Sequence, residues 1–310
     1  MAVSTKIEWT DETWNPVTGC TRISEGCERC YIERTPPLRM AHRRFDSPQI
    51  GATTGVRLHP ERLRRPLEWR KPRRIFVCSM ADLFHEDVPD NYIGSVFDTM
   101  ASAPQHTFQV LTKRPARART LLQRWQTNAE SDTHFQASWR RHDMLWCDAS
   151  LWPLPNVWLG VSAEDQRWAD IRIPVLLDTP AAKRFVSAEP LLGPIDLTRR
   201  GLLAPDEFER RLDWVIVGGE SGPGARPMHP EWARSLRDQC TAAGMPFLFK
   251  QWGEYITTEQ MTEATYMTWD IEHGSAQYHP SVQWRVGKKR AGRELDGRTW
   301  DEFPEVPDGA

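Results

Sequence analysis

Cys20, Cys27 and Cys30 stand on one short segment with the spacing C-x6-C-x2-C. Gly19 and Gly26 flank the longer gap and let the backbone curl, so that three thiols can point at one centre. Thiolates are ligands of zinc and of iron–sulfur clusters. The residue types and their spacing therefore predict a metal or cluster site on the loop formed by residues 19–31.

The identity of the bound group follows from the number of ligands. A structural zinc site takes four ligands, and the next candidates, His42 and His59, are not at the usual spacing. A four-iron cluster held by three cysteines leaves one iron open to an exogenous ligand, which lets the cluster bind and activate a substrate. The spacing favours the cluster. Zinc completed by a distant ligand, and cysteines with unrelated structural roles, are the alternatives.

The composition is that of a soluble globular protein, with 310 residues, 39% hydrophobic and 26% charged. The length suits one α/β barrel or two smaller domains. No apolar run approaches the roughly twenty residues needed to cross a bilayer, and Met1–Trp14 lacks the apolar core of a signal peptide. We expect a cytoplasmic protein without a membrane partner. The other cysteines, Cys78, Cys147 and Cys240, are isolated and predict buried thiols, not disulfides.

The net charge is only −2, but basic residues gather in two places. Between Arg34 and Arg74 there are twelve Arg or Lys residues against three acids, and a second basic run extends from Lys113 to Arg124. Clustered arginines can bind phosphate, although solvated faces and intramolecular ion pairs are commoner. A nucleic acid or a nucleotide is therefore a candidate substrate.

Short apolar runs alternate with helical segments along the chain. The expected helices are 91–101, 115–125, 164–177 and 230–243, and the expected strands are 6–9, 75–79, 108–112, 157–161, 184–187, 214–218 and 246–250. This alternation is typical of repeated β-α-β units and a parallel sheet. No Gly-x-Gly-x-x-Gly turn follows the first run, which favours a barrel over a doubly wound sheet. We predict an α/β fold, a partial (β/α) barrel of about six to seven parallel strands.

Polar residues follow most of these strands. In a parallel barrel all strand ends meet at the carboxyl face, where the cysteine loop also arrives and where active sites are built. Capping of the next helix is the commoner role of each such residue taken alone. The bare backbone of Gly218 and Gly219 would admit a ribose, adenine or sulfonium ligand closely. The polar endings are Ser79–Asp82, Thr112–Arg114, Ser162–Glu164, Ser187–Glu189, Gly219–Ser221 and Lys250–Gln251.

The domain organisation is predicted as a partial barrel over residues 1–254 and a C-terminal extension over residues 255–310. The barrel includes the cluster loop 19–31 and an insertion near 126–156, which carries Trp139, Trp146 and Trp152 and would lie over the site. In the extension, a hairpin is expected within Met261–Trp284 and a polar strap after it.

Several motifs together resemble the phage-associated three-Cys-motif protein family. The resemblance covers about Lys6 to Trp252 and again Asp296 to Pro304. That family is in turn similar to a distant branch of the radical S-adenosylmethionine enzymes. Three features depart from the usual pattern of those enzymes: the cysteine spacing is not C-x3-C-x2-C, Arg29 replaces the aromatic residue that usually precedes the third cysteine, and the Gly-Gly-Glu motif follows a late strand instead of the second. The motifs are Lys6–Thr10, Trp14–Cys20, His85–Pro89, Leu111–Pro115, Ser187–Leu191 and Gly218–Gly222.

The resemblance implies a four-iron, four-sulfur (4Fe-4S) cluster on Cys20, Cys27 and Cys30. It also implies an enzyme that generates a 5′-deoxyadenosyl radical from S-adenosyl-L-methionine to modify or repair a nucleobase or nucleotide. An electron donor such as flavodoxin or ferredoxin and a protein partner encoded nearby would assist it. The alternative is a non-catalytic iron–sulfur or zinc protein that binds nucleic acid. The implied S-adenosylmethionine contacts are Ser79, Asp82, Ser162, Glu164, Glu189, Gly218, Gly219 and Glu220.

Overall fold

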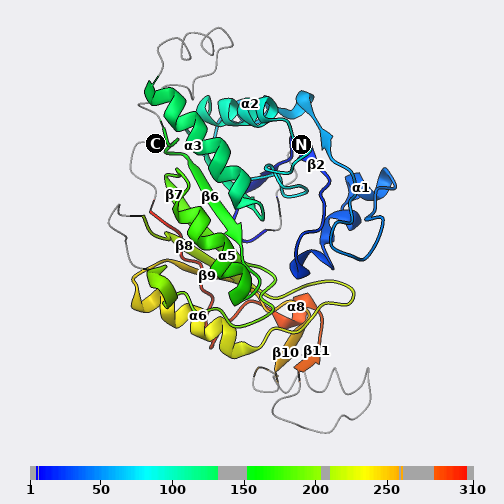
Figure 1. The fold of residues 1–310 in the computed structure, drawn as a ribbon. Coiled ribbons are helices and arrows are strands. Elements are labelled where there is room, and N and C mark those ends of the chain that lie inside the picture. Colours follow the sequence, from blue (N-terminus) through cyan, green and yellow to red (C-terminus); the bar gives the residue numbers. More distant parts are fainter. Residues whose placement is uncertain are drawn as a thin grey trace.

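A seven-stranded parallel sheet dominates the computed structural model, which describes residues 5, 7–131, 152–203, 210–257, 260 and 283–305 (Figure 1). The strands pair in the order β1-β4-β5-β6-β7-β8-β9, so each neighbours the next member of the sheet along the chain. A sheet with this order has no switch point and curls as part of a barrel. The predicted α/β partial barrel is thus confirmed. The strands are β1 (Glu12–Trp14), β4 (Arg74–Val77), β5 (Thr107–Thr112), β6 (Val157–Ser162), β7 (Lys183–Ala188), β8 (Trp214–Gly218) and β9 (Phe247–Gln251).

Helices cover the convex face of the sheet (Figure 1). The main ones are α2 (Asp90–Ala101), α3 (Pro115–Ser131), α5 (Gln166–Leu177) and α6 (Pro230–Ala242); α1 (Pro36–Met40) and α8 (Lys288–Ala291) are short. Outward strand residues such as Val110, Val161 and Val215 are fully buried against them. The strands are therefore buried on both faces, which is why they read as continuous apolar runs.

The predicted first strand at Lys6–Trp9 is wrong, because β1 begins at Glu12 and pairs with β4. Trp9 instead enters the concave side of the sheet and is only 2% exposed. Its ring lies 4.5 Å from that of Phe76 and meets Trp214 edge-on at 6.4 Å. These aromatic residues lie toward the amino ends of the strands, so they fill the lumen below the expected site.

Two small antiparallel pairs flank the sheet. β2 (Val17–Thr18) pairs with β3 (Arg57–Leu58), and β10 (Tyr255–Thr257) pairs with β11 (Gln283–Arg285). The last described residues return to the edge strand β9, where the Phe249 amide donates to the Trp300 carbonyl. This return covers an edge that would otherwise be open to pairing with another chain.

Some predictions fall on parts of the chain outside the described residues. They are Cys147, most of the insertion near 126–156, including Trp139 and Trp146, and most of the expected hairpin within Met261–Trp284. Across the described ranges, the five cysteines are free thiols, and no helix has the length and apolar character to span a membrane.

Candidate metal-cluster site

The cysteine loop sits on the turn that follows β4, at the carboxyl edge of the sheet. The Gly19 amide donates to the Met80 carbonyl at 2.9 Å, and Gly19 bridges Ala81 in parallel fashion. The Cys20 amide donates to the Thr54 hydroxyl at 3.0 Å, which ties the loop to the following excursion. The loop therefore arrives at the face where the strand-end residues gather.

Nearby charges and burial act on the pKa values of two of the three thiols, Cys20 and Cys30. Burial and the charge of Asp82 raise the pKa of the Cys20 thiol to about 12; Arg114 opposes this shift, and Cys27 and Cys30 add to it. Burial raises the pKa of Cys30 to about 11, against the backbone amide of Ile32 and the positive charges of Lys113 and Arg22. Cys20 and Cys30 are partly exposed, whereas Cys27 is buried. The loop thus carries three neighbouring thiols.

Positive charge next to two of the thiols opposes the effect of burial, although the pKa values of Cys20 and Cys30 remain raised overall. The Arg114 Nη1 lies 3.8 Å from the Cys20 Sγ, and positive charge also reaches Cys30. Hydrogen bonds and cations next to ligand sulfurs stabilise thiolates and the clusters they hold. Among the residues that the structure describes, no three His, Cys, Asp or Glu side chains converge tightly enough to hold one metal ion. A cluster places each cysteine on a different iron, so the donor set fits a cluster better than a single zinc ion.

Glu164 holds the cysteine loop through a hydrogen bond with Ser24. It is fully buried and accepts hydrogen bonds from Ser24 Oγ at 2.7 Å, Lys113 Nζ at 2.5 Å and Arg172 Nη1 at 2.9 Å. Burial opposes its ionisation, but the charges of Lys113 and Arg172 and the hydrogen bonds outweigh burial and lower the pKa of Glu164 to about 2. The carboxylate lies before α5, which begins at Gln166 and not at residue 164 as predicted.

Two further carboxylates of the predicted set hold arginines against the loop. Asp82 accepts from the Thr112 hydroxyl at 2.7 Å and from Arg114 at 3.3 Å, and Arg114 also donates to the Thr21 carbonyl. Glu220 accepts from Arg226 at 2.6 Å, and Arg226 donates to the Glu25 carbonyl at 2.9 Å. Strand-end carboxylates thus position the loop through charge-assisted hydrogen bonds.

The other predicted contacts lie around the same edge. The Ser79 hydroxyl bonds to the Asn15 side chain at 3.2 Å, and its carbonyl accepts from the Tyr31 hydroxyl. Ser162 is buried, and its carbonyl accepts from Arg172. Glu189 pairs with Lys250 at 2.8 Å and accepts from Ser187 at 3.1 Å.

The two adjacent glycines border the chain itself. A Cβ at Gly218 would lie 2.8 Å from Glu189 Oε1, and one at Gly219 would lie 1.9 Å from the Trp252 carbonyl oxygen. Both positions therefore exclude a side chain because internal groups already occupy the space.

The family model described as "Protein of unknown function (DUF5131)" matches residues 4–304. The chain belongs to the DUF5131 family. Among curated proteins, none is detectably similar to this DUF5131 sequence.

Solved structures of spore photoproduct lyase show a weak likeness to the DUF5131 chain. For a cysteine-to-serine variant the TM-score is 0.39 at 11% identity, with 91% of this chain and 66% of that chain covered. For a variant with bound AdoMet and dinucleoside spore photoproduct the TM-score is 0.41 at 9% identity, covering 90% and 65%. This chain thus spans just under two thirds of those proteins. The fold assignment rests on the strand order described above.

Several residues of the site were missed in the sequence. They are Ser24, Arg172, Arg226 and Trp168, whose indole donates to Glu25 at 2.8 Å. Arg172 had a readable signal, because it shares the buried stripe of α5 with Ala169, Ile173 and Leu176. A charged residue on an apolar helical stripe needs a buried partner. That the partner is Glu164, in contrast, could not be predicted from the sequence.

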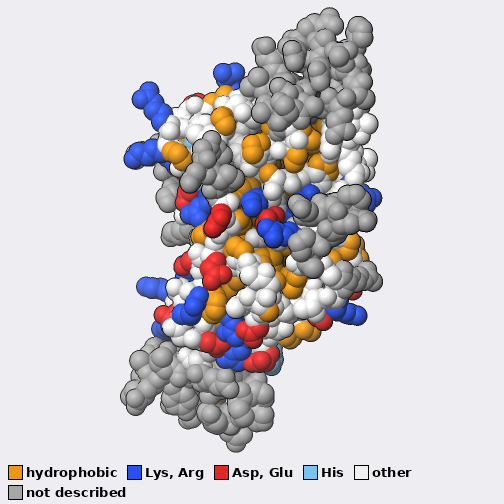
Figure 2. Space-filling view, turned by 90° about the vertical axis from the view of Figure 1, so that its left-hand side faces the viewer, with side chains coloured by type: hydrophobic (Ala, Val, Ile, Leu, Met, Phe, Trp, Pro, Cys, Tyr) orange, Lys and Arg blue, Asp and Glu red, His pale blue; other side chains and the backbone are white. Residues whose placement is uncertain are grey.

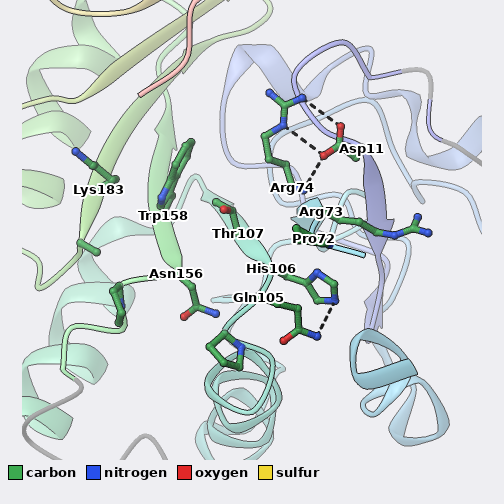
Figure 3. A pocket seen from close by; sticks show the side chains of 13 residues that line it. Asp11, Pro72, Arg73, Arg74, Gln105, His106, Thr107, Asn156, Trp158 and Lys183 are labelled. Atoms are coloured by element: carbon green, nitrogen blue, oxygen red, sulfur yellow. Dashed lines mark hydrogen bonds and ion pairs between the residues drawn. The ribbon is translucent and has the colours of Figure 1, made fainter. Parts of the chain in front are cut away.

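The pocket in Figure 3 lies at the opposite end of the sheet from the cysteine loop. It encloses about 330 Å³ beside the amino ends of β4 to β7, and Figure 3 shows Arg74 turned toward Asp11 at its rim. Each cation of its wall has a carboxylate partner: Arg73 with Glu12, Arg74 with Asp11 and Lys183 with Asp213. The wall is thus neutralised internally, and in parallel barrels this face serves stability more than catalysis.

Gly26→Ala should displace the cysteine loop. A Cβ there would lie 2.5 Å from the Cγ and Oε1 of Glu164, a side chain that is buried and held by three donors. We expect a loss of about 1–3 kcal/mol in the free energy of unfolding, measured in urea. In the Glu164→Asp background, where the carboxylate is shorter, Gly26→Ala should cost less; equal costs in both backgrounds would contradict the contact.

Proposed function

We propose that this chain binds a 4Fe-4S cluster through Cys20, Cys27 and Cys30 and is a radical S-adenosylmethionine enzyme that acts on a nucleobase or nucleotide. One observation carries the proposal: three neighbouring thiols lie beside cations at the carboxyl ends of a parallel half-barrel. Three cysteines complete three irons and leave one for an exogenous ligand. Zinc would need a further donor.

When bound and reduced by an external one-electron donor, the cluster supplies the electron that breaks the sulfonium carbon–sulfur bond of S-adenosylmethionine, giving methionine and a 5′-deoxyadenosyl radical. The chain's own residues would position the cofactor and shield the radical. Of the eight proposed cofactor contacts, Ser79 and Glu189 are partly exposed, and Glu189 with Lys250 offers paired charges to an amino acid moiety. The other six members are buried, and three of them, Asp82, Glu164 and Glu220, also hold the cysteine loop directly or through arginines; the remaining three are Ser162, Gly218 and Gly219.

The test starts with anaerobic reconstitution and measurement of iron and sulfide per chain. The loaded protein is then incubated with dithionite and S-adenosylmethionine under argon, and 5′-deoxyadenosine is sought by mass spectrometry. We expect about four irons per chain and slow formation of the product even without the substrate. Cys20→Ala, treated identically, should form none. A fully loaded cluster without cofactor binding or product would overturn the radical mechanism.

The engagement of the site carboxylates favours a second candidate, a non-catalytic iron–sulfur protein that binds nucleic acid. Asp82, Glu164 and Glu220 all form ion pairs with arginines of the same chain, as expected where a cluster is structural or senses redox state. The same experiment separates the two candidates, because only the enzyme forms 5′-deoxyadenosine.

A further inference from the structure

The excursion between the cysteine loop and β4 is strongly basic. Residues 34–71 contain ten Arg or Lys against three acids, although the whole chain has a net charge of −2. Figure 1 shows this segment, drawn in blue, along the right-hand side of the molecule, away from α3, α5 and α6. We call it the 34–71 segment.

Most cations of the 34–71 segment are not neutralised. Two are engaged, since Arg43 donates to the Thr54 and Thr18 carbonyls and Arg62 pairs with Glu61 at 3.5 Å. Within the part of the chain that the structure describes, the other eight are exposed and take part in no ion pair, although Arg34 donates to the Arg29 carbonyl at 3.3 Å. The eight are Arg34, Arg39, Arg44, Arg57, Arg64, Arg65, Arg70 and Lys71.

The second basic run behaves in the opposite way. On α3, Arg117 and Arg124 both pair with Asp90 at 2.8 Å, and Arg119 pairs with Asp178 at 3.3 Å. Lys113 and Arg114, just before the helix, pair with buried carboxylates. Figure 2, which views the left-hand side of Figure 1, shows positive and negative side chains interspersed on that face. The two runs thus differ in kind, and only the first presents uncompensated charge.

We propose that the 34–71 segment binds the phosphate backbone of a nucleic-acid strand and leads one of its bases to the cysteine loop. Uncompensated like charges repel one another, and a polyanion relieves that repulsion while releasing its own counterions. Seven of these eight cations without an ion pair are arginines, whose planar guanidinium fits phosphate with two parallel hydrogen bonds.

Exposed apolar side chains on the 34–71 segment and just before it favour a nucleic acid over an acidic protein. Tyr31, which directly follows Cys30, is 49% exposed, and Met40 and Ile50 are 77% and 61% exposed. Stacking on an aromatic ring contributes about 1–3 kcal/mol per base and is tolerant of sequence. A strand that follows the arginines would therefore meet a stacking surface beside the candidate cluster. This inference deepens the proposed function by naming a polymer as the substrate class.

The test measures binding of a fluorescently labelled single-stranded 20-mer to the full chain by anisotropy at increasing KCl, before and after cluster reconstitution. Binding should weaken steeply with salt, and Arg39→Gln/Arg44→Gln should reduce the slope of log affinity against log salt by about 1.4, at about 0.7 per lost contact. The matched control Arg119→Gln/Arg124→Gln removes two ion-paired arginines of α3 and should leave the slope unchanged. Circular dichroism verifies that both double variants are folded.

The outcomes are distinguishable from those for the proposed function, because binding does not require the cluster or its chemistry. Absence of binding at low salt, or an equal loss in both double variants, would overturn the inference. Displacement of the 20-mer by AMP as readily as by unlabelled strand would point to a free nucleotide. Displacement by polyglutamate of equal charge would point to an acidic protein. Either result would also overturn the inference.

Discussion

Replacing any one of Cys20, Cys27 and Cys30 by alanine should abolish incorporation of the cluster. The three sulfurs share one loop, and cations lie beside Cys20 and Cys30. A cluster with two protein ligands would expose two irons, which favours loss of the cluster. Iron and acid-labile sulfide per chain after anaerobic reconstitution measure the effect, and both should fall to background.

The matched controls are Cys78→Ala and Cys240→Ala. Both thiols are buried in the main core, and burial raises the pKa of Cys240 to about 12, so each acts as a small apolar side chain. Both variants should bind as much iron and sulfide as the wild type. Full loading of a Cys20, Cys27 or Cys30 variant would remove the basis of the proposed function.

Glu164→Ala should destabilise the fold by about 3–5 kcal/mol, because it leaves Arg172 buried without its carboxylate. Arg172 is 1% exposed and pairs with Glu164 at 2.9 Å. Urea unfolding measures the change. Glu86→Ala is the control: Glu86 also pairs with an arginine, Arg114, but its side chain is 62% exposed, so the expected loss is about 0–1 kcal/mol. Equal losses in the two variants would refute a stabilising role for the buried pair.

The same carboxylate sets an acid dependence of stability. The pKa of Glu164 lies at about 2 in the folded chain, below its ordinary value of 4.5. The ionised carboxylate therefore contributes roughly 3 kcal/mol to the free energy of unfolding. This contribution is fully present above pH 4.5 and is lost as the pH falls toward 2. In Glu164→Gln the free energy of unfolding should fall less steeply across that interval than in the wild type. Parallel curves would show that Glu164 does not titrate there.

The sequence predicts the main elements of the fold well where burial is local and continuous. Val157–Ser162, for example, is buried at every position and reads directly as a parallel strand. The first strand is different, because Glu12 is a buried acid that becomes acceptable only through Arg73, at 2.8 Å and 61 residues away. Ile7 and Trp9 alternate with polar residues as in a strand, but the Trp9 indole packs against aromatic rings from several strands.

In the candidate site, too, features that are local in the sequence could be predicted and features that depend on the folded sheet could not. The cysteines lie close together in the sequence, so their grouping on one loop follows from their spacing, while the cluster that they would hold stays a prediction. The roles of Arg172 and Arg226 are not visible, because each depends on a carboxylate or carbonyl that only the folded sheet brings near. The glycine pair after β8 has a structural reason that spacing alone does not show, because a Cβ at either position would meet Glu189 or the Trp252 carbonyl; its contact with a cofactor stays a prediction.

The supports of the cysteine loop also set an order of events during synthesis. Ser24 meets Glu164 across 140 residues, and the Glu25 carbonyl meets Arg226 across 201. A ribosome adds about 5–20 residues per second, so the cysteines emerge many seconds before the strands that hold them. Until then the loop lacks its buried anchors, and its thiols lie on an unfinished chain. We expect iron and sulfide to be inserted after translation is complete, and a chain arrested before β8 to carry all three ligands yet fail to retain the metal.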